Sequence, residues 1–487
     1  MAEVEGTTPA PAATEPPALA NPAELLMSRS YLVLLFFGAA IGVPVAAFAY
    51  FFLKAVAEMQ RYVFSTLPSE VGFHGEPAWW PMLPLALSGL LVGLSIRYLP
   101  GTSGHKPAEG FKAAGAVAPI ELPGIVIAAF ATLSLGVVLG PEAPLIAVGS
   151  GMGVLAVHLV KRDAPSMAAV VIGAAGSFAA VSTLLGSPIV GAFLLMEAAG
   201  LGGPLLGVVM VPGLLAAGIG SLIFVGLDNW TGYGHQTLAI PHIPAFTTPD
   251  AAELLWAVGI GVVAAVVGTA IKWIALWLQP RVEGRMVLLT PVVGVAVAGC
   301  AIAFGEASGQ HASEVLFSGQ SALGSLIHNA SSWTVGALLL LVLFKGLAYG
   351  ASLSCFRGGP TFPGMFIGAA GGIALSHLPG LPLIAGVAMG IGAMTVAMLG
   401  LPLTSVLLAS LFLETDAIAS MPLVIVAVVV AYVATARLRP LLPTIPSVPP
   451  PDTTAPAAPP GGARVPSAPP DTTAPAGVPA DTSAVTT

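Results

Sequence analysis

The chain has 487 residues, of which 56% are hydrophobic and only 8% are charged, with a formal net charge of −7. Soluble domains carry about 25% charged residues, so this composition indicates a polytopic helical membrane protein. The negative balance gives no sign of a nucleic-acid partner. Only Cys300 and Cys355 are present, which implies no disulfide framework, and the eight histidines lack metal-binding spacing, so no metal site is expected.

The first half of the chain follows a short lead. Residues 1–26 are rich in Ala and Pro and predict a disordered segment. The first membrane repeat is expected over residues 27–226, and a break at 186–188 divides a pair of short helices within it. The apolar segments expected in this half are 32–53, 82–96, 120–138, a helix after Pro144, the pair within 166–199, and 204–225.

A polar stretch without Lys or Arg, residues 227–250, is expected to be an extracytoplasmic linker between the halves. The second membrane repeat is expected over residues 251–442, where Gly400-x-Pro402 repeats the interruption of the first half. Many apolar segments are shorter than about 18 residues, so tilted, broken or re-entrant helices are expected. The segments of this half are 251–278, 286–304, 334–348, 364–375, 380–397, 402–413 and 422–434.

Residues 443–487 form a low-complexity tail of Pro, Ala and Thr. The motif PDTTAPA occurs at 451–457 and again at 470–476. This composition predicts a disordered segment, and no soluble regulatory domain is expected within it.

Basic residues gather on one side of the predicted topology. We therefore expect that side and both termini to face the cytoplasm, in a multi-pass protein of the cell membrane. Lys54 and Arg61 fit this assignment less well. The residues that support it are Arg97, Lys106, Lys161, Arg162, Arg281 and Arg285.

Two matching breaks organise the chain. In residues 137–153, VVLGPEAPLIAVGSGMG, an apolar segment breaks at Gly140-Pro141, shows one carboxylate, Glu142, and resumes as a helix after Pro144. The same spacing of Gly-Pro, Pro and Gly returns in residues 359–372, GPTFPGMFIGAAGG. Paired breaks in the two halves of an apolar chain predict a transporter built from repeats, with its site at their interface. Free amides at the two helix N-termini predict an anion site.

Glu142 is the strongest candidate for a functional side chain. A carboxylate inside an apolar region is costly unless it is hydrogen-bonded or protonated. At a helix N-terminus it mimics an anion and competes with one for the same amides, so that its protonation would release the site. The alternative is an acid that only caps a helix. We favour the gating interpretation because the break at Glu142 has a counterpart in the second half.

The remaining polar residues have weaker claims. Ser103, in Thr102-Ser103-Gly104, has a hydroxyl that suits either an anion or an ordinary helix N-cap. Glu197, Lys345 and Glu414 lie at segment ends or within apolar stretches, where structural pairing or snorkelling is at least as good an explanation. Catalytic motifs such as HExxH, GxGD or a Ser/Lys pair do not occur in the spans, so the chain is expected not to be an enzyme.

Residues from about 27 to 442 resemble the CLC family of chloride channels and proton-coupled anion antiporters, of the prokaryotic type without CBS domains. The resemblance rests on LGPEAPLIAVG (139–149), SGHKPAEG (103–110) and GGPTFPGMFIGAAGG (358–372), which are similar to the family's G(K/R)EGP, GSGIP and GGxFxPxxxxG motifs. In addition, 186–197 and 401–416 look like the family's paired interface helices.

The resemblance implies an all-α membrane fold of two inverted-topology halves, assembled as a homodimer with one pore per subunit. It places Glu142 at the family's gating glutamate. It implies chloride as the substrate, with no cofactor, and a lipid bilayer as the surroundings. The anion-binding positions that it implies are Ser103, Gly140, Ala143, Gly359, Thr361 and Phe362.

Several residues depart from the family pattern. Ala198 stands where the exchangers of the family carry a proton-path glutamate, and Leu442 falls near the position of the central tyrosine. Pro141 and Pro360 replace residues that offer backbone amides, and proline has none. The motif phenylalanine comes one place late, at Phe362. Since each charge-assisted hydrogen bond is worth about 1.5–3 kcal/mol, we expect an altered central site.

The leading hypothesis is chloride permeation of the channel type, gated by Glu142. The alternatives are a proton-coupled chloride antiporter, in which protons are a second substrate, and a related carrier for another small inorganic anion. Ala198 favours the channel slightly, because no evident internal carboxylate delivers protons to Glu142.

Overall fold

The computed structural model describes residues 27–73, 75–111, 115–162, 166–200, 203–232, 249–413 and 417–443. The predicted N-terminal lead, most of the predicted linker, and the tail from residue 444 lie outside the described residues. Glu414 also lies outside them.

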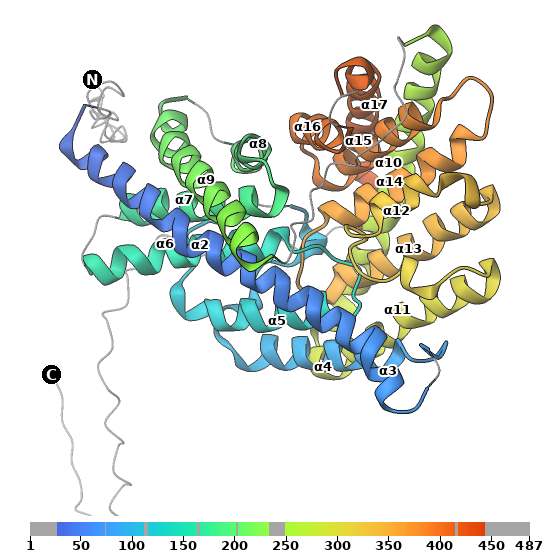
Figure 1. The fold of residues 1–487 in the computed structure, drawn as a ribbon, viewed down its shortest axis with the longest axis horizontal. Helices are drawn as coiled ribbons and strands as arrows, with labels where there is room; N and C mark the ends of the chain where they lie inside the picture. Colours follow the sequence, from blue (N-terminus) through green and yellow to red (C-terminus); the bar gives the residue numbers. More distant parts are fainter. Residues whose placement is uncertain are drawn as a thin grey trace, which may run out of the picture. The chain divides into compact units, whose positions relative to one another are not determined.

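Every regular element in these ranges is helical, apart from one isolated β-bridge (Figure 1). Eight helices of the described chain are long and apolar enough to cross a membrane, and others are apolar but shorter. The chain is therefore a multi-pass membrane protein with incomplete spans, as its composition predicted. The helices of the first half are α2 (Arg29–Arg61), α3 (Leu67–Glu70), α4 (Met82–Tyr98), α5 (Leu122–Ser134), α6 (Glu142–Val160), α7 (Ser166–Leu185), α8 (Pro188–Ala198) and α9 (Gly203–Thr231).

The second half also contains eight helices within the described residues. Its helices are α10 (Ala251–Glu283), α11 (Met286–Ser308), α12 (Leu323–His328), α13 (Val335–Cys355), α14 (Thr361–Ser376), α15 (Leu383–Leu399), α16 (Pro402–Leu413) and α17 (Ala417–Leu438). Short 3-10 turns connect several of them. Helices α2 and α10 run well beyond the predicted spans, because their polar last turns stay helical where composition predicted a loop.

Equivalent helices of the two halves pack in equivalent pairs. In the first half α6 packs on α7, α7 on α9, and α2 crosses both α7 and α9 (Figure 1). In the second half α14 packs on α15, α15 on α17, and α10 crosses both α15 and α17. The same set of contacts thus occurs twice, as the repeated sequence motifs predicted.

Glycines allow the closest of these crossings. A Cβ on Gly149 of α6 would overlap the backbone of Gly176 on α7, and a Cβ on Gly368 of α14 would overlap the backbone of Gly390 on α15. Gly149 and Gly368 hold the same place in the two sequence motifs. Small residues at helix interfaces are the usual means by which membrane helices approach closely, so this spacing sets the packing of both halves.

Two pairs of helices make contacts between the halves. Helix α4 crosses α11, where a Cβ on Gly89 or Gly294 would overlap the facing backbone. Helix α8 meets α16. Buried side chains from both halves form one large hydrophobic cluster.

Candidate functional site

The two sequence breaks meet backbone to backbone. The Gly140 N–H donates to the Gly359 carbonyl at 2.8 Å, and the Gly359 N–H donates to the Gly140 carbonyl at 2.6 Å. This antiparallel pair is the isolated bridge of the fold. Because Gly140 and Gly359 hold equivalent places in the two motifs, the bridge joins the non-helical segments that precede α6 and α14.

A helix begins directly after each strand of this bridge. Helix α6 starts at Glu142 and α14 starts at Thr361, each two or three residues earlier than predicted. Pro144 and Pro363 therefore lie third in their helices rather than before them. The earlier start is allowed because the first amides of a helix have no intrahelical acceptor, so a proline there removes no bond.

The Glu142 side chain is buried between these two helix starts. It is 1% exposed, and its Oε1 accepts a hydrogen bond from the Thr361 N–H, the first amide of α14. Its Oε2 has no hydrogen-bond partner within the described residues, and no cation of that part forms an ion pair with it. A Cβ on Gly140 or Gly359 would overlap the carboxylate. The carboxylate thus fills a space that glycines leave open at a helix N-terminus.

Further polar groups line the start of α14. The Thr361 hydroxyl is buried and has no partner in the described chain. The hydroxyl of Tyr349, on α13, donates to the Pro360 carbonyl at 2.6 Å. Phe362 is buried as the second residue of α14. The sequence analysis did not identify Tyr349. It expected the position of the family's central tyrosine to fall near Leu442, so that this hydroxyl would be absent. The only sequence signal for Tyr349 is a tyrosine within an apolar helix.

Ala143 follows Glu142 in the first turn of α6 and is half-buried. Its amide lies in the turn whose N–H groups have no intrahelical partner. Gly140, Ala143, Gly359, Thr361 and Phe362, the predicted anion-binding positions of the two breaks, therefore lie together around the Glu142 carboxylate.

Ser103, the remaining predicted position, lies in a separate loop. It is 1% exposed, and its Oγ and the Ser95 Oγ share a hydrogen bond of 2.8 Å. It does not cap an α-helix, because Thr102 and Ser103 adopt positive φ angles of 50° and 58°. The structure shows no hydrogen bond between Ser103 and Glu142. Instead, Arg357 Nε donates to the Thr102 carbonyl at 3.2 Å and so connects this loop to the second break.

Lys345 and Glu197 both have structural partners. Lys345 is fully buried, and its Nζ donates to the carbonyls of residues 314–317 at 2.8, 3.1, 3.0 and 3.4 Å, so it does not snorkel. Glu197 lies in the last turn of α8 and accepts from the amides of Leu403 and Thr404 at 3.0 and 2.8 Å. It also accepts from the Thr404 hydroxyl at 2.6 Å. Glu197 thereby caps α16.

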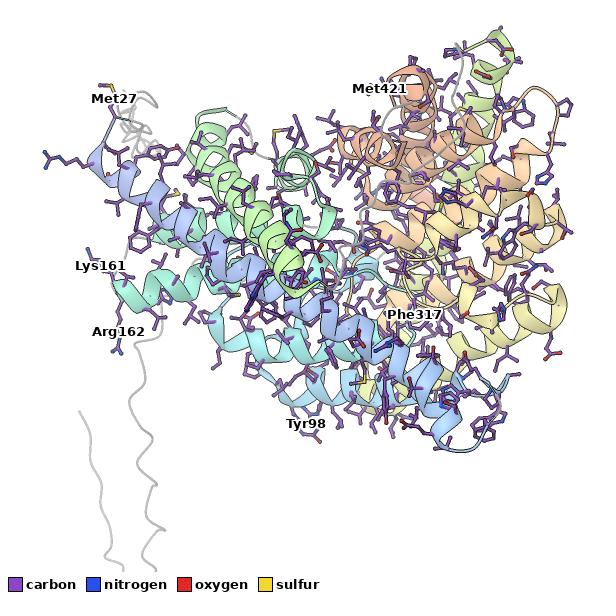
Figure 2. All side chains as sticks on the ribbon, viewed as in Figure 1. Met27, Tyr98, Lys161, Arg162, Phe317 and Met421 are labelled. Atoms are coloured by element: carbon purple, nitrogen blue, oxygen red, sulfur yellow. The ribbon has the colours of Figure 1, made fainter. Side chains whose placement is uncertain are left out.

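A cavity of about 390 Å³ reaches the residue that precedes Glu142. Its lining includes Pro141, Lys54, Arg61 and Phe317. Phe317, which Figure 2 labels, packs on Phe64 with ring centroids 5.0 Å apart. Lys54 and Arg61, the basic residues that fitted the predicted orientation poorly, thus line an approach to the site.

The fold and site define a membrane transport protein built from inverted repeats. The family model described as voltage gated chloride channel matches residues 88–436. The chain therefore belongs to this family, whose members transport anions across membranes.

Similar proteins agree with this assignment. The proteins YfeO of Escherichia fergusonii and of an Escherichia coli strain, both named for ion transport, are each 29% identical over 363 residues, 73% of this chain and 82% of theirs. The solved structure of a slow cyanobacterial Cl⁻/H⁺ antiporter has a TM-score of 0.67 at 19% identity, over 83% of this chain and 94% of that one. The solved structure of a CLC-type fluoride/proton antiporter has a TM-score of 0.63 at 18% identity, over 83% of this chain and 96% of that one. These two structures share the fold.

Proposed function

We propose that the protein carries chloride across the membrane and that Glu142 is its gate. The observation that supports this is the buried carboxylate on the first amide of α14, beside the Gly140–Gly359 pair. A helix N-terminus attracts negative charge, through its free amides and its dipole. The carboxylate and a permeating anion therefore compete for the same place.

Protonation of Glu142 opens this gate. The neutral side chain loses its attraction to the start of α14 and leaves the Thr361 amide, which an anion then occupies. Glycine at positions 140 and 359 gives the anion the space that the carboxylate vacates. In this mechanism anion flux rises as the pH falls and Glu142 takes up its proton.

Transport without coupled protons is our first candidate for the mode of permeation. Ala198 supplies no carboxylate, and Glu197 beside it is held by three hydrogen bonds at the start of α16. Proton-coupled exchange is the second candidate, and it is favoured by the two structural neighbours, which are both antiporters. A carrier for another small anion is the third, because the two prolines remove amide donors from the site.

We also propose a homodimer with one pore in each subunit, both termini in the cytoplasm, and the cell membrane as its location. Helices α8 and α16 are the proposed dimer interface, and the exposure of Ile189 and Leu403, 62% and 44%, on these two helices supports it.

Flux from liposomes tests the proposed function. Purified protein is reconstituted, and chloride and proton movements are recorded together under opposing gradients. Chloride efflux that is faster than from empty liposomes supports anion permeation, and its absence contradicts it. Uphill proton movement driven by a chloride gradient selects the exchanger over the channel.

A further inference from the structure

Arg357, the residue directly before Gly358, carries a buried charge. Its side chain is 4% exposed. Its Nη1 donates to the carbonyls of Cys355 and Phe356 at 3.4 and 3.2 Å, in addition to the bond from Nε to the Thr102 carbonyl. Its Nη2 makes no hydrogen bond to the described part of the chain. The guanidinium is thus held through two of its nitrogens and keeps donors for a further ligand.

No carboxylate of the described residues forms an ion pair with Arg357. Glu109 and Glu283 act on it electrostatically, but both are paired with Lys106, at 3.9 and 2.7 Å. Glu142 is engaged with Thr361. The carboxylates of Glu109 and Glu283 share the single charge of Lys106, so one negative charge remains to offset the guanidinium from a distance. Because neither carboxylate pairs with Arg357 directly, its remaining donors stay open to an anion from outside the protein.

The position of Arg357 fits an anion on the transport path. Its Nε reaches the loop that carries Ser103, and the next residue, Gly358, lies so close to Leu139 that a Cβ there would overlap it. The Arg357 side chain therefore reaches the Ser103 loop, and its backbone lies directly before the Gly140–Gly359 pair. These are the two parts of the chain to which the predicted anion-binding residues belong.

We propose that Arg357 contacts the transported anion and replaces the amide donors that Pro141 and Pro360 lack. This inference rests on the proposed function. A halide takes one or two N–H groups of the guanidinium, whereas a small planar oxyanion such as nitrate accepts two parallel ones. The site is thus specific for small monovalent anions, and its affinity depends on a side-chain charge.

A purely structural role for Arg357 makes different predictions. The Thr102 carbonyl belongs to a residue with positive φ, and the bond from Arg357 stabilises that conformation. If this were its whole role, substitution would lower the thermal stability without changing the affinity of the folded protein for anions. Anion affinity therefore separates the two roles.

The test is calorimetric titration of chloride and of nitrate into purified protein, with gluconate as the only other anion. Loss of a charge-assisted contact in Arg357→Gln is expected to weaken chloride binding about tenfold or more. Arg357→Lys keeps the charge but loses the two parallel N–H groups of the guanidinium. It is therefore expected to weaken the binding of nitrate more than the binding of chloride. The control is Arg97→Gln, an exposed arginine at the end of α4, with unchanged affinities.

Equal chloride affinity in wild type and folded Arg357→Gln overturns the inference. If that variant does not fold, wild-type crystals soaked in bromide decide: a bromide in contact with the guanidinium supports the proposal, and bromide bound only elsewhere overturns it. Wild-type liposomes without chloride flux contradict the proposed function itself. Wild-type flux together with an unaffected Arg357→Gln variant contradicts only this inference.

Discussion

Gly359→Ala should close the site to anions without altering the Glu142 side chain. A Cβ at this position would overlap the Glu142 carboxylate. Gly359 has no positive φ, so alanine adopts its backbone conformation without strain, and the hydrogen bonds of its pair with Gly140 use only backbone atoms. The methyl group would fill the place beside the Thr361 amide that the carboxylate occupies and that a permeating anion needs.

The size of the effect follows from the bond that is lost. A hydrogen bond to a charged group contributes about 1.5–3 kcal/mol, so its loss weakens the binding of an anion at this amide about ten- to a hundredfold. Chloride efflux from liposomes should therefore fall most at acidic pH, where the wild-type gate is open, and its dependence on pH should largely disappear.

Gly371→Ala is the matched control, because a Cβ at this glycine of α14 has open space around it. Its flux should keep the pH dependence of wild type. The reasoning is refuted if Gly359→Ala is as thermally stable as the control and yet shows wild-type flux at every pH.

Three further predictions concern two polar side chains and the C-terminal tail. Lys345→Met leaves the carbonyls of residues 314–317 without their donor and should cost about 1–3 kcal/mol of stability, and an unchanged melting temperature in detergent contradicts this. Glu197→Ala removes the cap of α16 and should cost about 1 kcal/mol, with no change in the ratio of protons to chloride; a changed ratio would place Glu197 on a proton route. Deletion of residues 447–487 removes no apolar segment and should leave liposome flux intact, so a folded but inactive truncation refutes it.

Much of the fold could be predicted because the residues that start and end its helices can be recognised in the local sequence. Prolines and glycines mark helix starts, and Pro402 begins α16 where the Gly400-x-Pro402 motif predicted. The ends were harder: the predicted segment ended at residue 278, just before Pro280, but α10 continues through this proline to Glu283. The early starts at Glu142 and Thr361 were missed, because their prolines fit the third helical position as well as the first.

The site could be predicted only in part, because its contacts join distant segments. The repeated spacing indicated that the two breaks belong to one site, but the hydrogen bond from Thr361 to Glu142 depends on how the halves pack. Tyr349 and Arg357 lie within or beside an apolar helix, and nothing local shows what they contact. A charged residue in an apolar region is itself a signal of function. Arg357 beside the second break is such a residue.

The most direct test of the account is the pH dependence of chloride efflux for wild type and Glu142→Gln. The amide side chain mimics the protonated carboxyl, so the variant should conduct at neutral pH as well as at acidic pH. Wild-type flux should rise as the pH falls, and Glu197→Gln, the same change at a structural acid, should follow wild type. If Glu142→Gln instead tracks wild type across the whole range, Glu142 is only a helix cap and the proposed gate is wrong.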